Sequence, residues 1–378
     1  MSLADNVDFL RRLSRDSELR TGRTSQPQAH NPLVEVTNFG TNPGELKMLT
    51  YVPGVREKRP ALVVVLHGCG QKAAAYDIGT GWSELAARYG FALLFPEQKS
   101  ANNANTCFNW FTPADTVRDS GEPHSIRQMI AKMSADYKID PERIYITGLS
   151  AGGAMASVML ATYPEVFAAG SIIAGLPYGV AGNLQDALKS MYRPPVHAAD
   201  MLGESVRAAS PHKGRWPRLS IWHGSGDSTV SPVNGEEIVR QWTDVHGLQE
   251  TPTSEGLVDT ALRQVWQGKA GTSLVESYTI PQMAHGTPIG VGEDDEQYGE
   301  PGPYLLAAGI SSTWHSAKFF GLTGNPVEVQ QLRAIDTPQA IPEAVGPDLD
   351  DLDLPITARA REIGTVITRA LTAAGLIK

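Results

Sequence analysis

Apolar and polar positions follow two recurring patterns along most of the chain. A continuous apolar run, typical of a strand buried on both faces of a sheet, occurs at residues 60–66, and mainly apolar or β-branched runs at 91–95, 143–147, 168–174 and 219–224 predict further buried strands. Between these runs, the spacing of apolar residues predicts helices at 81–89, 125–137, 151–163 and 238–246. Late strands are predicted at 263–266 and 273–280, and a closing helix at 304–320. Strands that alternate with helices predict an α/β fold with a mostly parallel central sheet flanked by helices.

The two ends of the chain and one internal segment depart from this alternation. We expect an N-terminal arm at residues 1–44, with two strands around a turn within residues 31–52. The catalytic domain is predicted at 45–322, and its long insertion at 177–217 has helical patches and is expected to cover the site like a lid. Residues 323–378 form a C-terminal extension, first rich in Pro and Asp and then helical, which we expect to pack on the main domain.

Charge and composition exclude some classes of partner. The 378 residues are 41% hydrophobic, enough for a full core, and their net charge of −9 disfavours a nucleic-acid partner. Apolar runs are too short to cross a bilayer, so we expect no membrane partner. Charged residues interrupt residues 1–23, so we expect no signal peptide in this chain. An extracellular or periplasmic location would then require that an export signal had been removed, and the alternative is the cytoplasm.

One short segment carries the strongest chemical signal. Residues 148–152 read Gly-Leu-Ser-Ala-Gly, between a predicted strand and a predicted helix. A Gly-x-Ser-x-Gly sequence at such a junction is typical of a nucleophile elbow, a turn so sharp that its neighbours must lack bulky side chains. The alternative is a structural glycine turn, and the flanking strand and helix favour the elbow. We therefore predict that Ser150 is a nucleophile.

A serine nucleophile needs a histidine base, which a carboxylate orients. In an α/β-hydrolase fold the acid and then the base follow the serine along the chain, each in a loop after a strand. Asp227 and His285 both occupy such loops, so we predict that Ser150, Asp227 and His285 form a catalytic triad. His67 and His223 end strands before glycines, and we expect them to bind loop backbone instead.

The negative charge of a tetrahedral intermediate requires two preset N–H donors. The residue after the nucleophile, Ala151, supplies the first donor. The loop after an early central strand supplies the second, for which we predict the Cys69 N–H, with the Gly68 N–H as the alternative. Three aromatic side chains are candidates for lining the substrate pocket, although core packing fits each of them equally well: Trp110, Tyr178 and Trp222.

Cys69 and Cys107 are the two cysteines of the chain. No histidine or aspartate stands at a spacing that would complete a zinc site, and we expect neither a metal nor another cofactor. Two buried thiols and a disulfide between the two loops fit the residues equally well.

Several motifs together resemble the polyhydroxybutyrate depolymerase family of serine esterases, which is related to feruloyl and acetylxylan esterases. They are HGCGQ at 67–71, CFNWF at 107–111, GEPHSI at 121–126, GLSAGG at 148–153, AGLPY at 174–178, WHG at 222–224 with Asp227, and AHG at 284–286. The resemblance covers residues 45–320 and implies an α/β-hydrolase fold, the triad Ser150, Asp227 and His285, and oxyanion donors at Cys69 and Ala151. The two motif cysteines often occur as a pair in that family, which favours a disulfide between them.

The combined prediction is a metal-independent serine carboxylic ester hydrolase that works through an acyl-enzyme. The resemblance favours short-chain hydroxyalkanoate esters or oligomers, with a feruloyl or acetylxylan esterase as the alternative. Because the chain shows no separate linker and binding domain of the kind expected in extracellular polymer-degrading members, we expect small soluble or oligomeric substrates. An acyltransferase with the same triad and a non-catalytic binding module are the other classes considered. The sequence makes no prediction of oligomeric state.

Overall fold

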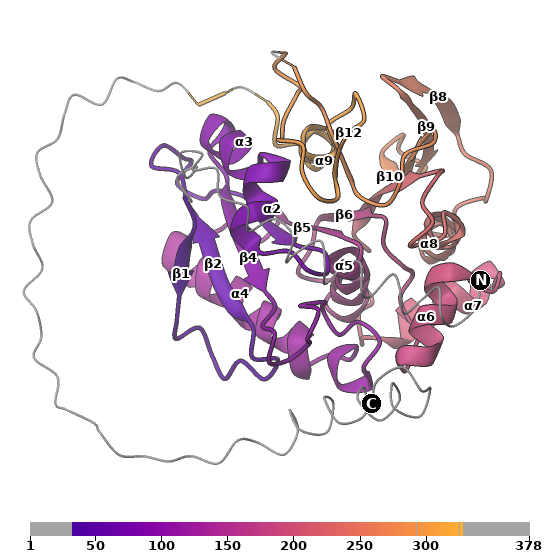
Figure 1. Cartoon of the computed structure of the whole chain (residues 1–378), viewed down its shortest axis with the longest axis horizontal. Coiled ribbons are helices and arrows are strands. Elements are labelled where there is room, and N and C mark those ends of the chain that lie inside the picture. Colours follow the sequence, from indigo (N-terminus) through magenta and orange to yellow (C-terminus); the bar gives the residue numbers. More distant parts are fainter. Residues whose placement is uncertain (1–31, 293, 325, 328–378) are drawn as a thin grey trace, which may run out of the picture. The chain divides into compact units, whose positions relative to one another are not determined.

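The computed structural model describes residues 32–292, 294–324 and 326–327, in which a ten-stranded sheet forms the centre (Figure 1). The strands are β1 (Val34–Val36), β2 (Lys47–Tyr51), β3 (Leu62–Leu66), β4 (Ala92–Glu97), β5 (Ile144–Leu149), β6 (Ala169–Ile173), β7 (Arg218–Gly224), β8 (Ser254–Val258), β9 (Ala261–Gln267) and β10 (Ser273–Ile280). The helices are α2 (Ala73–Thr80), α3 (Trp82–Tyr89), α4 (Gly121–Tyr137), α5 (Ala151–Thr162), α6 (Leu184–Tyr192), α7 (Ala199–Ala208), α8 (Val233–Val245) and α9 (Ser312–Phe320).

The sheet is parallel in its centre and antiparallel at both ends. Its order is β1-β2-β4-β3-β5-β6-β7-β10-β9-β8, and neighbouring strands from β4 to β10 in this order are parallel. Strand β4, which follows β3 in the sequence, lies on one side of β3, and β5 lies on its other side. Such a switch point opens a crevice at the carboxyl ends of the strands. The prediction of a mostly parallel α/β sheet is therefore confirmed, and the switch point marks the edge of the sheet where a site is expected.

The continuous apolar runs reflect a sheet covered on both faces. On β3, Leu62, Val64 and Leu66 contact the core on one face, whereas Val63 and Val65 contact the core on the other. Helices α4, α5, α7 and α8 contribute buried side chains to the first core, and α2, α3 and α9 contribute to the second. Because successive strand residues point to opposite faces, a strand between two cores, such as β3, can be apolar at every position.

Three predicted helices begin at other residues than expected, and two further elements were not predicted. The closing helix begins at Ser312 rather than at 304, because Ser311 caps it by accepting the Trp314 N–H, and the preceding residues form β12 (Leu305–Ala307) beside β11 (Thr287–Ile289). Helix α2 was not predicted, and it is short and separated from α3 by Gly81. Strand β8 was not predicted because it lies at the sheet edge, where four of its five residues are exposed. Helices α4 and α8 begin earlier than predicted.

The predicted insertion at 177–217 contains α6 and α7. Helix α7 packs against α8 and α5, and the Ser231 N–H donates to the Met191 carbonyl of α6 at 2.7 Å. Its role as a lid remains a prediction. Strand β1 lies within the predicted N-terminal arm and pairs with β2, as the two-strand prediction requires. Residues 1–31 of that arm, and the extension from residue 328 on, lie outside the described residues. Within the described part, no helix combines the length and apolarity needed to cross a bilayer.

Candidate active site

Ser150 occupies the turn between β5 and α5 in a backbone conformation that side chains rarely adopt. Its φ of 56° and ψ of −117° place it outside the regions favoured by non-glycine residues. Two backbone hydrogen bonds hold the turn: the Ser150 N–H donates to the Ile173 carbonyl at 2.9 Å, and the Ala154 N–H donates to the Ser150 carbonyl at 2.8 Å. The surrounding strand and helix therefore hold a strained serine at the carboxyl edge of the sheet.

The glycines on both sides of Ser150 permit a close approach of backbone to backbone. A Cβ at Gly148 would overlap the backbone of Gly152, and a Cβ at Gly152 would overlap the carbonyl oxygens of Leu66 and His67. Any side chain at either position would push α5 away from β3 and β5. This packing explains why the turn needs its Gly-x-Ser-x-Gly sequence.

The three residues predicted as a triad converge in the structure. The His285 Nε2 lies 2.9 Å from the Ser150 Oγ, and the His285 Nδ1 lies 2.7 Å from the Asp227 Oδ2. Asp227 follows β7 and His285 follows β10, which are neighbouring parallel strands, so both loops emerge at the same edge of the sheet as the Ser150 turn. All three side chains are buried. The arrangement is that of a hydroxyl, an imidazole and a carboxylate hydrogen-bonded in series.

Three N–H groups bind the Asp227 carboxylate, and a fourth nitrogen lies close to it. Its Oδ1 accepts the backbone N–H groups of Thr229 at 2.9 Å and Val230 at 2.8 Å, and its Oδ2 lies 2.7 Å from His285 Nδ1 and 3.3 Å from His223 Nε2. Burial alone would raise the pKa of Asp227, but the hydrogen bonds from the two histidines outweigh it and hold the pKa well below its usual range. An ionised Asp227 keeps the His285 proton on Nδ1 and leaves Nε2 free to accept a proton from Ser150.

His223 has a second contact that the sequence analysis missed. As predicted, it binds loop backbone, with its Nε2 2.9 Å from the Val230 carbonyl oxygen. The same nitrogen also approaches the Asp227 Oδ2 at 3.3 Å. The four-residue separation of His223 and Asp227 across a Gly-Ser-Gly turn is the signal that would have indicated this contact.

The structure distinguishes between the two candidates for the second oxyanion donor. The Gly68 N–H donates to the Gln71 Oε1 at 2.9 Å and is therefore occupied. Within the described residues, neither the Cys69 N–H nor the Ala151 N–H has a hydrogen-bond acceptor. Two free N–H groups beside the serine suit the stabilisation of an oxyanion, and the geometry favours Cys69 over Gly68.

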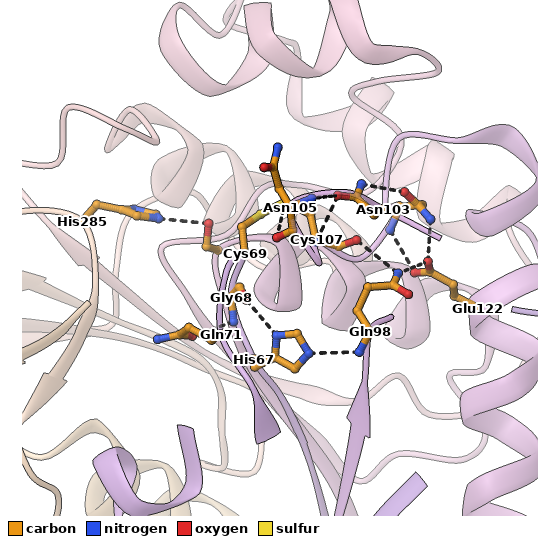
Figure 2. Close-up of a disulfide and its surroundings, with 12 residues drawn as sticks. His67, Gly68, Cys69, Gln71, Gln98, Asn103, Asn105, Cys107, Glu122 and His285 are labelled. Atoms are coloured by element: carbon orange, nitrogen blue, oxygen red, sulfur yellow. Dashed lines mark hydrogen bonds between the residues drawn. A yellow bond between two sulfur atoms is a disulfide. The ribbon is translucent and has the colours of Figure 1, made fainter. Parts of the chain in front are cut away.

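A disulfide joins Cys69 to Cys107 beside the Ser150–His285 pair (Figure 2). The alternative of two free thiols, which the residues alone left open, is not what the structure contains. His67 holds the start of the same loop: its Nδ1 lies 2.7 Å from the Gly68 carbonyl oxygen, and its Nε2 accepts the Gln98 N–H at 3.1 Å. Burial lowers the pKa of His67 to about 4, so the ring is neutral and serves as a structural bridge, as predicted.

The aromatic residues proposed for the pocket behave differently from one another. Trp222 is 0% exposed and stacks on Tyr278 with ring centroids 3.7 Å apart, so its assignment to the pocket is wrong. It points to the core that α9 covers, because the two aromatic residues are register partners on β7 and β10. Trp110 is buried in the opposite core. Tyr178 is half-buried, and its hydroxyl donates to the Thr116 carbonyl at 3.0 Å. A pocket role for Trp110 or Tyr178 remains a prediction.

Comparison with known proteins places this geometry in a family. The sequence matches the family described as Esterase PHB depolymerase over residues 46–260. The chain belongs to this esterase family. Its relatives include the poly(3-hydroxyalkanoate) depolymerase C of Paucimonas lemoignei, which is 45% identical over 77% of this chain and 70% of its own length. An acetylxylan esterase of Coprinopsis cinerea is 33% identical over 68% of this chain and 69% of its own length. A feruloyl esterase B of Neurospora crassa is 35% identical over 64% of this chain and 84% of its own length.

A solved structure supports the fold of this PHB depolymerase-family esterase. The acetyl xylan esterase from Aspergillus awamori superposes with a TM-score of 0.66 at 24% identity, covering 77% of this chain and 99% of that one. The predicted family, the α/β-hydrolase fold and the activity class of a serine carboxylic ester hydrolase are confirmed.

Proposed function

We propose that this esterase hydrolyses short 3-hydroxyalkanoate esters or oligomers through an acyl-enzyme formed on Ser150. The observation that carries the reaction type is the hydrogen-bonded series from the Ser150 Oγ through His285 to Asp227. The substrate class is supported by the 45% identity to a poly(3-hydroxyalkanoate) depolymerase, against 33% and 35% for the acetylxylan and feruloyl esterases.

Acylation begins when the Ser150 Oγ attacks the ester carbonyl carbon while the His285 Nε2 takes the hydroxyl proton. The electron pair of the carbonyl π bond moves to its oxygen, where the N–H groups of Cys69 and Ala151 stabilise the negative charge. The intermediate then collapses: the bond to the alcohol oxygen breaks, and His285 donates its proton to the leaving alkoxide. Asp227 stays ionised throughout and stabilises the imidazolium.

Deacylation repeats the same steps with water in place of serine. The His285 Nε2 takes a proton from water, and the resulting hydroxide attacks the acyl carbon. When the second tetrahedral intermediate collapses, the proton passes from His285 to the Ser150 Oγ. The hydroxy acid leaves and the enzyme returns to its starting state.

The test is a comparison of kcat/KM on three kinds of ester: methyl-capped 3-hydroxybutyrate oligomers, methyl ferulate and acetylated xylo-oligosaccharides. We expect the highest kcat/KM on the hydroxybutyrate oligomers and loss of all three activities in Ser150→Ala. A higher kcat/KM on methyl ferulate or acetylated xylan would favour the alternative that the relatives at 33% and 35% identity suggest. Hydrolysis that persists in Ser150→Ala would refute the acyl-enzyme mechanism.

A further inference from the structure

Glu122 is a buried carboxyl group for which the reaction described above has no use. It lies in the first turn of α4, within the motif at 121–126, and its side chain is 1% exposed. Burial, together with the negative charge of Asp115, raises the pKa of Glu122, whereas the hydrogen bonds that its oxygens accept from Asn109 and Gln98 lower it. A carboxyl group in the interior is costly unless hydrogen-bond partners surround it, and Glu122 has such partners.

Its contacts point to the loop that carries Cys107. The Glu122 Oε2 accepts the Asn109 backbone N–H at 2.9 Å, and its Oε1 accepts the Asn109 Nδ2 at 2.8 Å and the Gln98 Nε2 at 2.5 Å. The Glu122 carboxyl group therefore fixes the backbone and the side chain of Asn109, and it also fixes the side chain of Gln98, which follows β4.

Hydrogen bonds of the same network bind both the N–H and the carbonyl group of Cys107. The Gln98 Nε2 also donates to the Cys107 carbonyl oxygen at 3.1 Å. The Cys107 N–H donates to the Asn103 Oδ1 at 3.3 Å, and the Asn103 Nδ2 donates to the Asn109 Oδ1 at 3.0 Å. In Figure 2, Gln98, Asn103 and Glu122 lie on the side of the disulfide that faces away from His285.

Two connections run from this network to the oxyanion loop. The first is covalent, because the Cys107 sulfur is bonded to Cys69. The second is the Gly70 N–H, which donates to the Asn105 carbonyl oxygen at 2.8 Å. Cys69, the proposed oxyanion donor, is thus attached to the loop that carries Cys107 and that Glu122 holds. One attachment is its own side chain, and the other is the N–H of Gly70.

We propose that Glu122 is a positioning residue for the oxyanion hole, acting through Asn109, Cys107 and the disulfide on the Cys69 N–H. The proposal rests on the proposed function, because it assigns that N–H to the oxyanion. Glu122 does not touch the substrate. It fixes the place of a donor that must lie within hydrogen-bond distance of the charge that develops in the transition state.

The primary test is Glu122→Gln, which keeps the size of the side chain. A glutamine oxygen can still accept from Gln98 and from the Asn109 Nδ2, but its NH₂ group then faces the Asn109 backbone N–H, and that anchor is lost. With p-nitrophenyl 3-hydroxybutyrate we expect kcat to fall about 10- to 100-fold and KM to change less than about 3-fold, since the loss acts in the transition state. The inhibition constant of a trifluoromethyl ketone analogue should rise by the same factor as kcat falls.

The matched control is Glu276→Gln, a second buried carboxyl-to-amide change remote from these loops. Glu276 is 1% exposed on β10 and binds Arg263 and Ser220. We expect this variant to lose stability while its kcat stays within about 2-fold of wild type. If Glu122→Gln also lowers the melting temperature but leaves kcat and the inhibition constant unchanged, its role is structural only and the proposal is overturned.

A double-mutant cycle tests the route through the disulfide. In the Cys69→Ser/Cys107→Ser background the covalent connection is lost and only the hydrogen bond from the Gly70 N–H to Asn105 still joins the two loops, so Glu122→Gln should reduce kcat by a smaller factor than it does in the wild type. If Glu122→Gln lowers kcat by the same factor in both backgrounds, the proposed route through the disulfide is refuted. If Glu122→Gln does not fold, Asn103→Ala on the half-buried loop should lower kcat in the same direction, and an unchanged kcat there would also overturn it. Activity that survives Ser150→Ala would instead refute the proposed function itself.

Discussion

Asp227→Asn is the substitution that most directly tests the role assigned to the buried carboxylate. Asparagine has the same shape, but one of its two terminal atoms becomes a donor. The Oδ1 of Asp227 accepts two backbone N–H groups, from Thr229 and Val230, so the amide oxygen of the substituted side chain would take that place. Its NH₂ group would then face His285 Nδ1, which lies 2.7 Å from the present Oδ2. The imidazole would have to accept a hydrogen bond at Nδ1 and carry its proton on Nε2.

The size of the effect follows from this change of tautomer. A protonated Nε2 at 2.9 Å from the Ser150 Oγ cannot accept the serine proton, so general-base catalysis is lost while the oxyanion donors remain. Loss of the correct tautomer in a serine triad lowers kcat by about 10⁴-fold, which corresponds to about 5.5 kcal/mol of transition-state stabilisation. The fold should survive, because the variant keeps the volume of the side chain and the two backbone hydrogen bonds.

The assay is the steady-state hydrolysis of p-nitrophenyl acetate at pH 7.5, with the melting temperature measured in parallel. Asp140→Asn is the matched control: this aspartate also accepts a backbone N–H, from Glu142 at 3.2 Å, but it precedes β5 at the opposite edge of the sheet from the triad. We expect its kcat to equal that of the wild type. A folded Asp227→Asn variant with kcat within tenfold of the wild type would refute the assigned role.

Three further predictions concern stability and the oxyanion loop. Burial raises the pKa of Asp77 from 3.8 to about 6, so the folded state holds this proton more tightly than the unfolded state and loses stability as pH rises between these values. Asp77→Asn should remove that loss, which is at most about 3 kcal/mol and is measured as the difference between the free energies of urea unfolding at pH 4 and at pH 7.5. An equal difference in the wild type and the variant would contradict this prediction. The disulfide closes a sequence separation of 38, so Cys69→Ser/Cys107→Ser should lower the free energy of unfolding by about 4 kcal/mol, and a loss below about 1 kcal/mol would contradict this. Gln71→Leu removes the acceptor of the Gly68 N–H and should lower kcat about tenfold at an unchanged melting temperature, and an unaltered kcat would exclude this role.

The sequence predicts the parts of this molecule in which a local pattern has a unique physical cause. The apolar run at β3 can only be a strand between two cores, and the small residues around Ser150 are required by the close approach of Gly152 to Leu66. The order of serine, acid and base along the chain follows from the order of the parallel strands. These constraints made the fold and the triad predictable.

The rest depends on contacts between segments that no local pattern encodes. The carboxyl group of Glu122 accepts the N–H of Asn109 from across a loop, and the pairing of Cys69 with Cys107 depends on how two loops meet. For Trp222 the sequence left a pocket position and core packing open, because a strand tryptophan can point to either face, and its pairing with Tyr278 decides for the core. Tertiary contacts, rather than propensities, determine these features.

The central claim is that Ser150 carries the acyl group during turnover. The most direct measurement is mass spectrometry of the protein after p-nitrophenyl 3-hydroxybutyrate turnover is quenched with acid, with the modified peptide sequenced. The account predicts one hydroxybutyryl adduct on Ser150 in the wild type and none in Ser150→Ala, together with a burst of p-nitrophenol whose amplitude equals the enzyme concentration. An adduct on another residue, or undiminished turnover by Ser150→Ala, would contradict it.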